Sequence, residues 1–189
     1  MLGSPGPGIA ALVAIGRSGG VRSGLPFYAG LQLGLALVVL VCGLGLFSAL
    51  AAVPGLLLMM SVGGAAYLAY LAWQIASAPI AGAGDAPPPA RATALGGFLL
   101  GVLNPKAYLA LMALLSASVL IPDSRELDML LKMALCMAVI LAVDIAWLAA
   151  GAGLGTLRLT PLQERAMNVT MGVTVVLAAL AGFSASAPA

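Results

Sequence analysis

The sequence contains no histidine and few charged side chains, and both shortages exclude whole classes of protein. Histidine is the commonest general base and metal ligand, and no constellation of other nucleophilic or metal-binding residues takes its place. Only 7% of the 189 residues are charged, whereas a soluble domain carries about a quarter. The basic residues are scattered and form no patch for nucleic acid. We therefore expect no enzyme, no metal or cofactor site and no nucleic-acid partner.

Cysteine is scarce as well. The two cysteines, Cys42 and Cys136, both lie inside apolar runs, which does not resemble a secreted disulfide framework or a zinc site. One cysteine falls in each half of the chain, as in six-helix membrane proteins that carry electrons on thiols. A transmembrane redox carrier is therefore an alternative function, although a buried thiol with no cationic neighbour should be unreactive.

Long apolar runs dominate what is present. Hydrophobic residues make up 62% of the chain, and its mean hydropathy is +1.14. No charge occurs between Arg22 and Asp85 or after Arg165. A membrane-spanning helix needs about 20 apolar residues, because the hydrocarbon core is ~30 Å thick and a helix rises ~1.5 Å per residue. The runs therefore predict an all-α membrane protein with about six transmembrane helices in a lipid bilayer.

Turn residues divide these runs into two halves of three helices each. A linker rich in Pro, Ala and Gly, residues 78–92, separates a first repeat, residues 1–77, from a second, residues 93–189. The expected helices, the first of them shortened, span residues 1–15, 25–52, 56–77, 93–120, 129–150 and 162–183, with loops at 16–24 and 121–128.

Glycines recur at four-residue spacing inside several of these helices. Small residues at this spacing let helices approach closely in lipid, although in a chain with 24 glycines chance is the alternative. The pairs are Gly30 and Gly34, Gly97 and Gly101, and Gly151 and Gly155.

Each half also contains a proline break followed by an apolar run. The first break is SPGPG at residues 4–8, and the second is NPK at residues 104–106. If Pro7 is aligned with Pro105, each break opens a three-helix unit. Because three is odd, the second unit is inverted relative to the first, as in many secondary transporters. Half-helix N-termini at such breaks carry partial positive charge that suits a carboxylate, whereas a simple kink is the alternative.

Two ionisable side chains, Lys106 and Asp144, lie inside the expected helices. Burying either charge in lipid costs at least ~2.5 kcal/mol, so such residues usually face the bundle interior. We expect them to share one polar cavity, where Asp144 binds a substrate amine or a coupling proton and Lys106 binds a carboxylate or acts as counter-ion. A static ion pair is the alternative. Most of the weaker polar candidates, among them Gln32 and Asn168, are expected to form interhelical hydrogen bonds or to serve as interfacial anchors. The residues expected to line the substrate or ion path are Pro5, Gly6, Pro7, Gly8, Asn104, Pro105, Lys106 and Asp144.

These motifs together resemble the LysE/RhtB family of bacterial amino-acid exporters. The similarity covers nearly the whole chain: SPGPG, then GRSGGVRSGL, GGAAYLAYLAWQI, a variable linker, GFLLGVLNPKAYL and the stretch from Asp144 to Trp147. The resemblance implies a six-helix exporter of amino acids or their derivatives in the bacterial inner membrane, driven by a proton or ion gradient. A homo-oligomer is left open.

The chain departs from the family pattern at its start. The family usually has Asn where this sequence has Gly8, and about ten more apolar residues before the first motif. Either the assigned start lies inside the true coding sequence, or the chain is a shortened and inactive exporter paralogue.

Overall fold

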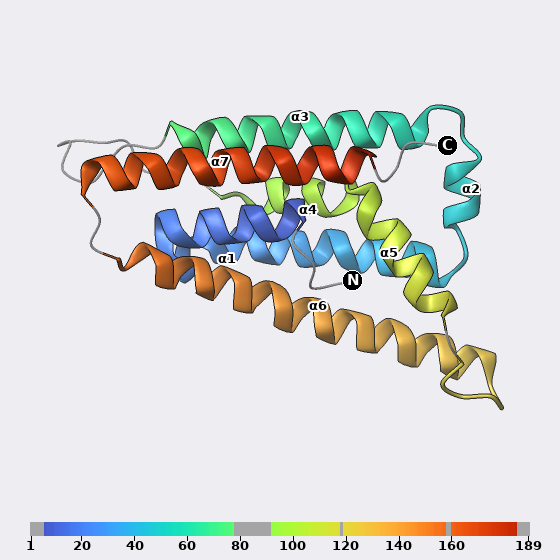
Figure 1. The fold of residues 1–189 in the computed structure, drawn as a ribbon. Helices are drawn as coiled ribbons and strands as arrows, with labels where there is room; N and C mark the ends of the chain where they lie inside the picture. The colour runs from blue at the N-terminus through green and yellow to red at the C-terminus, as the bar shows by residue number, and fades with distance from the viewer. Residues whose placement is uncertain (1–5, 78–91, 118, 158–159, 185–189) are drawn as a thin grey trace.

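The computed structural model describes residues 6–77, 92–117, 119–157 and 160–184, and these residues form seven helices and no strand (Figure 1). The predicted all-helical class is confirmed. By length and composition, two helices among the described residues can cross a membrane, or three if the bent pair α4–α5 counts as one span. The six-span inverted repeat stays a prediction. The helices are α1 (Pro7–Gly43), α2 (Phe47–Ala51), α3 (Leu56–Ala76), α4 (Ala94–Val102), α5 (Pro105–Ser116), α6 (Arg125–Gly155) and α7 (Pro161–Ser184).

Helix α1 is a hairpin of two helical arms. Gly20, with φ of +74°, adopts a left-handed conformation that glycine takes at no steric cost. A Cβ built on Gly8 would lie 3.6 Å from Leu31, although a straight helix would separate these two residues by ~35 Å. The ribbon of α1 accordingly doubles back on itself (Figure 1). We call residues 7–19 the first arm and residues 21–43 the second arm.

Two predicted boundaries around this hairpin are wrong. The loop expected at residues 16–24 is helical on both sides of Gly20, because one residue with positive φ is enough to reverse the chain. The second helix does not reach residue 52. It ends at Gly43, and Gly45, with φ of +73°, leads into the short α2.

The close helix contacts expected at the three glycine pairs are confirmed. A Cβ built on any of these six glycines would come within 3.0 Å of backbone atoms of a neighbouring helix. The contacts join the second arm of α1 to α4, and the first arm to α6. The hairpin is therefore held between α4 and α6 at backbone distance, which brings the side chains of α1 and α6 into direct reach of each other.

A substitution at one of these contacts should destabilise the protein. In Gly151→Ala, the new Cβ would lie 2.2 Å from the Val13 carbonyl oxygen, and overpacking of this kind costs about 1–3 kcal/mol. Gly153→Ala on the same helix is the matched control, because its Cβ meets nothing within 4 Å. We expect the first variant alone to melt at a lower temperature in detergent. Equal melting temperatures for the two variants would contradict the contact.

The predicted interruption of the fourth helix is confirmed. Helix α4 starts after Thr93, whose Oγ1 accepts a hydrogen bond from the Gly96 N–H at 3.0 Å, and it ends at Val102. Helix α5 restarts at Pro105, bent by 58° from α4. Proline has no N–H to donate but fits the first helical position well, so this residue both breaks the run and begins the next helix.

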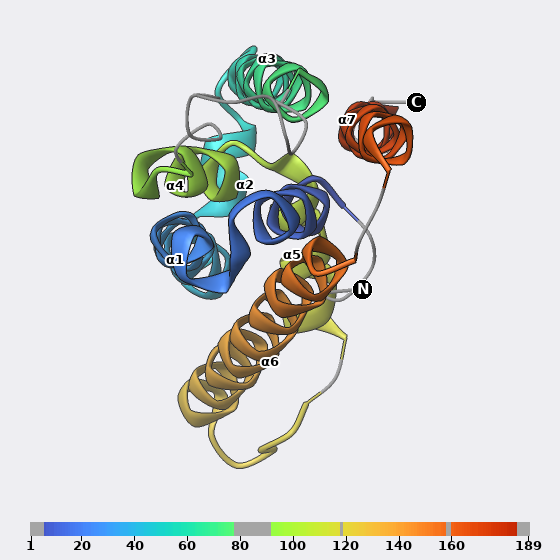
Figure 2. The same ribbon diagram turned by 90° about the vertical axis from the view of Figure 1, so that its left-hand side faces the viewer.

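Helix α6 is longer than predicted. It begins at Arg125 rather than at residue 129 because the Ser124 hydroxyl accepts a hydrogen bond from the Leu127 N–H and caps the helix. Helices α3 and α7 lie together on one side of α1, and α6 lies on the other (Figure 2). The start of the first arm, the second arm, α5 and α6 thus surround a common space.

Candidate functional site

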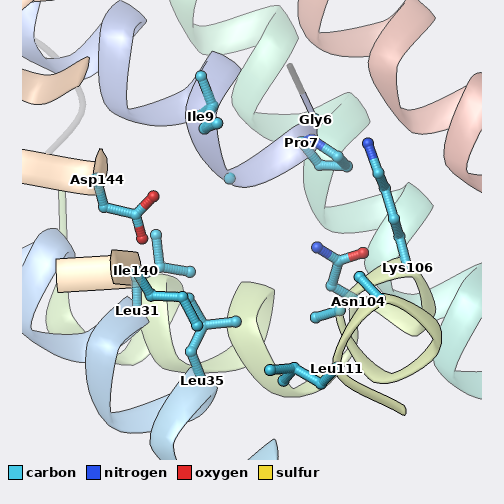
Figure 3. Close-up of a pocket in the computed structure, with 13 residues that line it drawn as sticks. Gly6, Pro7, Ile9, Leu31, Leu35, Asn104, Lys106, Leu111, Ile140 and Asp144 are labelled. Atoms are coloured by element: carbon cyan, nitrogen blue, oxygen red, sulfur yellow. The ribbon is translucent and has the colours of Figure 1, made fainter. Parts of the chain in front are cut away.

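The two proline breaks open onto one cavity of about 80 Å³ between α1, α5 and α6 (Figure 3). A single water needs at least ~10–15 Å³ of such volume, so the cavity has room for several waters or a small solute. Most of its lining is apolar, from residues such as Ile9, Leu31 and Ile140. The structure brings six of the eight expected path residues to this cavity: Gly6, Pro7, Gly8, Asn104, Lys106 and Asp144.

The other two expected residues differ. Pro105 is the first residue of α5 and stands between Asn104 and Lys106 without lining the cavity itself. Pro5 lies outside the described residues.

Two helix N-termini meet at this cavity. Helix α1 begins at Pro7 behind Gly6, and α5 begins at Pro105 behind Asn104. Neither N-cap residue forms a side-chain hydrogen bond to its helix. The first turn of a helix carries N–H groups without intrahelical partners and partial positive charge. The two starts therefore give one region of the cavity a positive potential.

Asp144 supplies the negative charge from α6. It is 5% exposed, and its Oδ2 accepts a hydrogen bond of 2.8 Å from Nε2 of Gln32, itself 7% exposed. The interhelical hydrogen bond expected for Gln32 is thereby confirmed. Sequence reasoning did not connect it with Asp144. The sequence does contain a sign of this role. Between Arg22 and Gln74 no residue is charged, and Gln32 is the one Asn or Gln.

Lys106 enters the cavity from α5, one residue after the proline. In Figure 3 its side chain extends toward Pro7, and Asp144 stands on the opposite side with its carboxylate directed inward. The cavity is therefore polarised: an acidic group lies on the α6 side, and a basic group with two helix N-termini lies on the other.

A second ionic cluster lies outside the cavity, at the start of α6. Asp128 and Lys132 form an ion pair of 2.7 Å and are 6% and 8% exposed. The Oδ1 of Asp128 also accepts hydrogen bonds from the N–H groups of Leu120 (2.5 Å) and Ile121 (2.9 Å), and Lys132 Nζ donates to the Leu115 carbonyl at 3.2 Å. These contacts join the end of α5 and the following loop to α6.

Other polar contacts tie helices together. Arg17 donates to the Oδ1 of Asn168 and so links α1 to α7, which confirms the hydrogen bond expected for Asn168. Both cysteines are free, and Cys42 is buried, with its thiol 3.8 Å from the Tyr108 carbonyl oxygen. Among the described residues, no group of three or more Cys, Asp and Glu could hold a metal ion.

Comparison with known proteins identifies the family. The family model described as "LysE type translocator" matches residues 1–186. A "Cysteine/O-acetylserine efflux protein" of Salmonella choleraesuis (strain SC-B67) is 30% identical over 149 residues, 78% of this chain and 75% of the relative. The protein of the same description from Escherichia coli (strain K12) is 29% identical over 178 residues, 94% of this chain and 89% of the relative.

No solved structure matches the chain at a significant level. The family match nevertheless runs almost from end to end and includes both proline breaks and Asp144. On this evidence, the chain belongs to the LysE type translocator family.

Proposed function

We propose that this protein exports amino acids or their derivatives across the bacterial cytoplasmic membrane as a multi-pass secondary transporter. The observation that carries the proposal is the polarised cavity, in which a buried carboxylate, a lysine and two helix N-termini surround one small space. The relatives described as cysteine/O-acetylserine efflux proteins make these two compounds the first substrates to test.

The charges of the cavity complement those of a zwitterion. The substrate ammonium would bind Asp144, and its carboxylate would lie toward Lys106 and the starts of α1 and α5. The mostly apolar lining favours an uncharged side chain over a long basic one. Asp144 and Lys106 would pair with the ammonium and the carboxylate that every amino acid carries. Neither would then remain to bind a charged side chain of the substrate.

The family membership and the two breaks also support alternating access. Pro7 and Pro105 begin helices at the same cavity although they belong to the two halves proposed as inverted repeats. In such transporters the halves rock around a site near the bilayer midplane. Asp144 would carry the coupling proton in the part of the cycle in which no substrate ammonium occupies the site.

The outer surface supports a position within the bilayer. Large apolar side chains are exposed on several helices, for example Leu33 on α1, Trp73 on α3 and Leu162 on α7. Exposed apolar area of this extent is stable in contact with lipid, whereas a soluble protein rarely exposes it. The first arm of α1 brings Pro7 and Gly8 to the cavity, which favours an active exporter over an inactive paralogue.

Everted membrane vesicles provide the test, because export from the cell becomes uptake into the vesicle. Vesicles that contain the protein should accumulate labelled cysteine or O-acetylserine when an ion gradient is imposed, and a protonophore should stop the uptake if protons drive it. Accumulation no greater than in vesicles without the protein, for every amino acid tried, would contradict export.

The same assay separates export from thiol redox chemistry. The double variant Cys42→Ser, Cys136→Ser should keep at least about half of the uptake, because neither thiol lines the cavity. A redox carrier would lose all activity with its thiols, since the thiolate is the reacting species. Loss of uptake in a well-expressed cysteine double variant would therefore favour the redox alternative.

A further inference from the structure

Gln32 is the group that the second arm of α1 presents to Asp144. Gly30 and Gly34 lie two residues to either side of it and contact the backbone of α4. Because each residue turns a helix by about 100°, Gln32 points away from α4 and toward α6. One turn earlier, the Tyr28 hydroxyl donates to the Leu141 carbonyl of α6 at 3.0 Å. Backbone packing behind the second arm thus holds the Gln32 amide against α6.

The amide is only half satisfied. Its Nε2 donates to Asp144, but its Oε1 is buried and accepts no hydrogen bond from the described residues. A buried acceptor without a donor is destabilising, so buried amides usually have partners for both atoms. The oxygen and nitrogen share one carbon, so this unpaired acceptor lies close to the Asp144 carboxylate, which lines the cavity, although Gln32 is not itself one of the lining residues.

We infer that Gln32 is a specificity-determining residue that forms, with Asp144, the receptor for the primary ammonium of the substrate. The receptor joins a carboxylate that accepts in several directions to an amide oxygen that still needs a donor. An ammonium group has three donors and no acceptor, whereas a hydroxyl has only one donor and is itself an acceptor. The pair should therefore select amino acids over hydroxy acids of the same shape.

This inference rests on the proposed export function and adds a residue to it. Asp144 alone would attract any cation. The amide adds direction, because its Nε2 fixes the carboxylate and its Oε1 takes a second N–H of the same ammonium. Removal of the amide should thus lower the discrimination between an amine and a hydroxyl more than it lowers the rate of transport.

The experiment uses everted vesicles and two competitors that differ in one group. L-serine carries an ammonium where L-glycerate carries a hydroxyl, and each is titrated against uptake of labelled L-cysteine. The ratio of the two inhibitory concentrations measures discrimination. In Gln32→Leu this ratio should fall at least tenfold, equivalent to about 1.4 kcal/mol. Tyr28→Phe is the matched control and should keep the wild-type ratio, because it removes another hydrogen bond between α1 and α6 and alters no residue that lines the cavity.

The possible results separate this inference from the export proposal. If wild-type vesicles transport no amino acid, the export proposal itself fails. If they do, and Gln32→Leu keeps the wild-type ratio, or Tyr28→Phe lowers it equally, the inference is overturned and the amide serves packing only. If the Leu variant does not reach the membrane, Gln32→Asn replaces it. Asparagine keeps the amide but is one methylene too short to hold Asp144, so the same ratio should fall in this variant.

Discussion

Asp144→Asn should reduce amino-acid uptake into everted vesicles about 100-fold while the protein remains at wild-type level in the membrane. The variant loses the negative charge that faces the cavity but keeps nearly the same shape and can still bond to Gln32. A hydrogen bond to a charged group is worth about 1.5–3 kcal/mol, and 1.4 kcal/mol is tenfold in affinity. An ammonium substrate should therefore bind far more weakly, and a coupling proton would have no carboxylate to occupy.

Substitutions of Lys106 test the basic side of the same cavity. Lys106→Met should also lower uptake, and Lys106→Arg should retain more of it, because arginine keeps the positive charge beside the two helix N-termini. Asp123→Asn is the control for loss of an acid, since Asp123 is exposed outside the helices. Equal transport by wild type, Asp144→Asn and Lys106→Met would remove the cavity from the mechanism.

Asp128→Ala should produce the largest loss of stability among single substitutions at polar residues. It leaves the Lys132 ammonium buried without its carboxylate and deprives the N–H groups of Leu120 and Ile121 of their acceptor. Removal of one partner of a buried pair is strongly destabilising. The melting temperature of the protein in detergent should fall on the order of 5 °C or more, since a protein of this size shifts by roughly 2–4 °C per kcal/mol.

Substitution of Lys132 shows which contacts of this ionic cluster contribute most to stability. Lys132→Met should cost less than Asp128→Ala, because Asp128 keeps its two backbone donors while a methionine stem fills the space of the lysine. The double variant should melt above Asp128→Ala, because the unpaired ammonium is gone, but below wild type, because both backbone N–H groups remain unsatisfied. If Lys132→Met melts lower than Asp128→Ala, the backbone contacts of Asp128 contribute little.

Local sequence determined the all-helical class and the positions of the breaks. A proline can begin a helix but cannot continue one without loss of a hydrogen bond, so the starts of α1 and α5 at Pro7 and Pro105 follow from the residues themselves. The glycine pairs likewise predicted close helix contacts because only residues without a side chain allow backbones to come so near. The family match rests on the same local motifs.

Some boundaries were misjudged because local signals compete. The charges of residues 123–128 favour a loop. The Ser124 cap and the acidic first turn nevertheless begin α6 there. Asp128 is buried by its contacts with Lys132 and with the loop before α6. Those contacts join segments that the sequence pattern treats separately. Likewise, residues 16–24 contain several glycines, and nothing in their order shows that Gly20 alone takes the positive φ.

What only the tertiary structure decided is which side chains meet. Hydropathy and proline place Lys106 and Asp144 inside apolar helices, but the cavity that both line depends on how the α1 hairpin lies between α4 and α6. The bond from Gln32 to Asp144 joins residues 112 positions apart. Helix formation depends on neighbours within about one turn, whereas the choice of partner depends on packing that the whole chain must satisfy together, and for that reason the sequence specified the helices and their breaks while the fold specified the site.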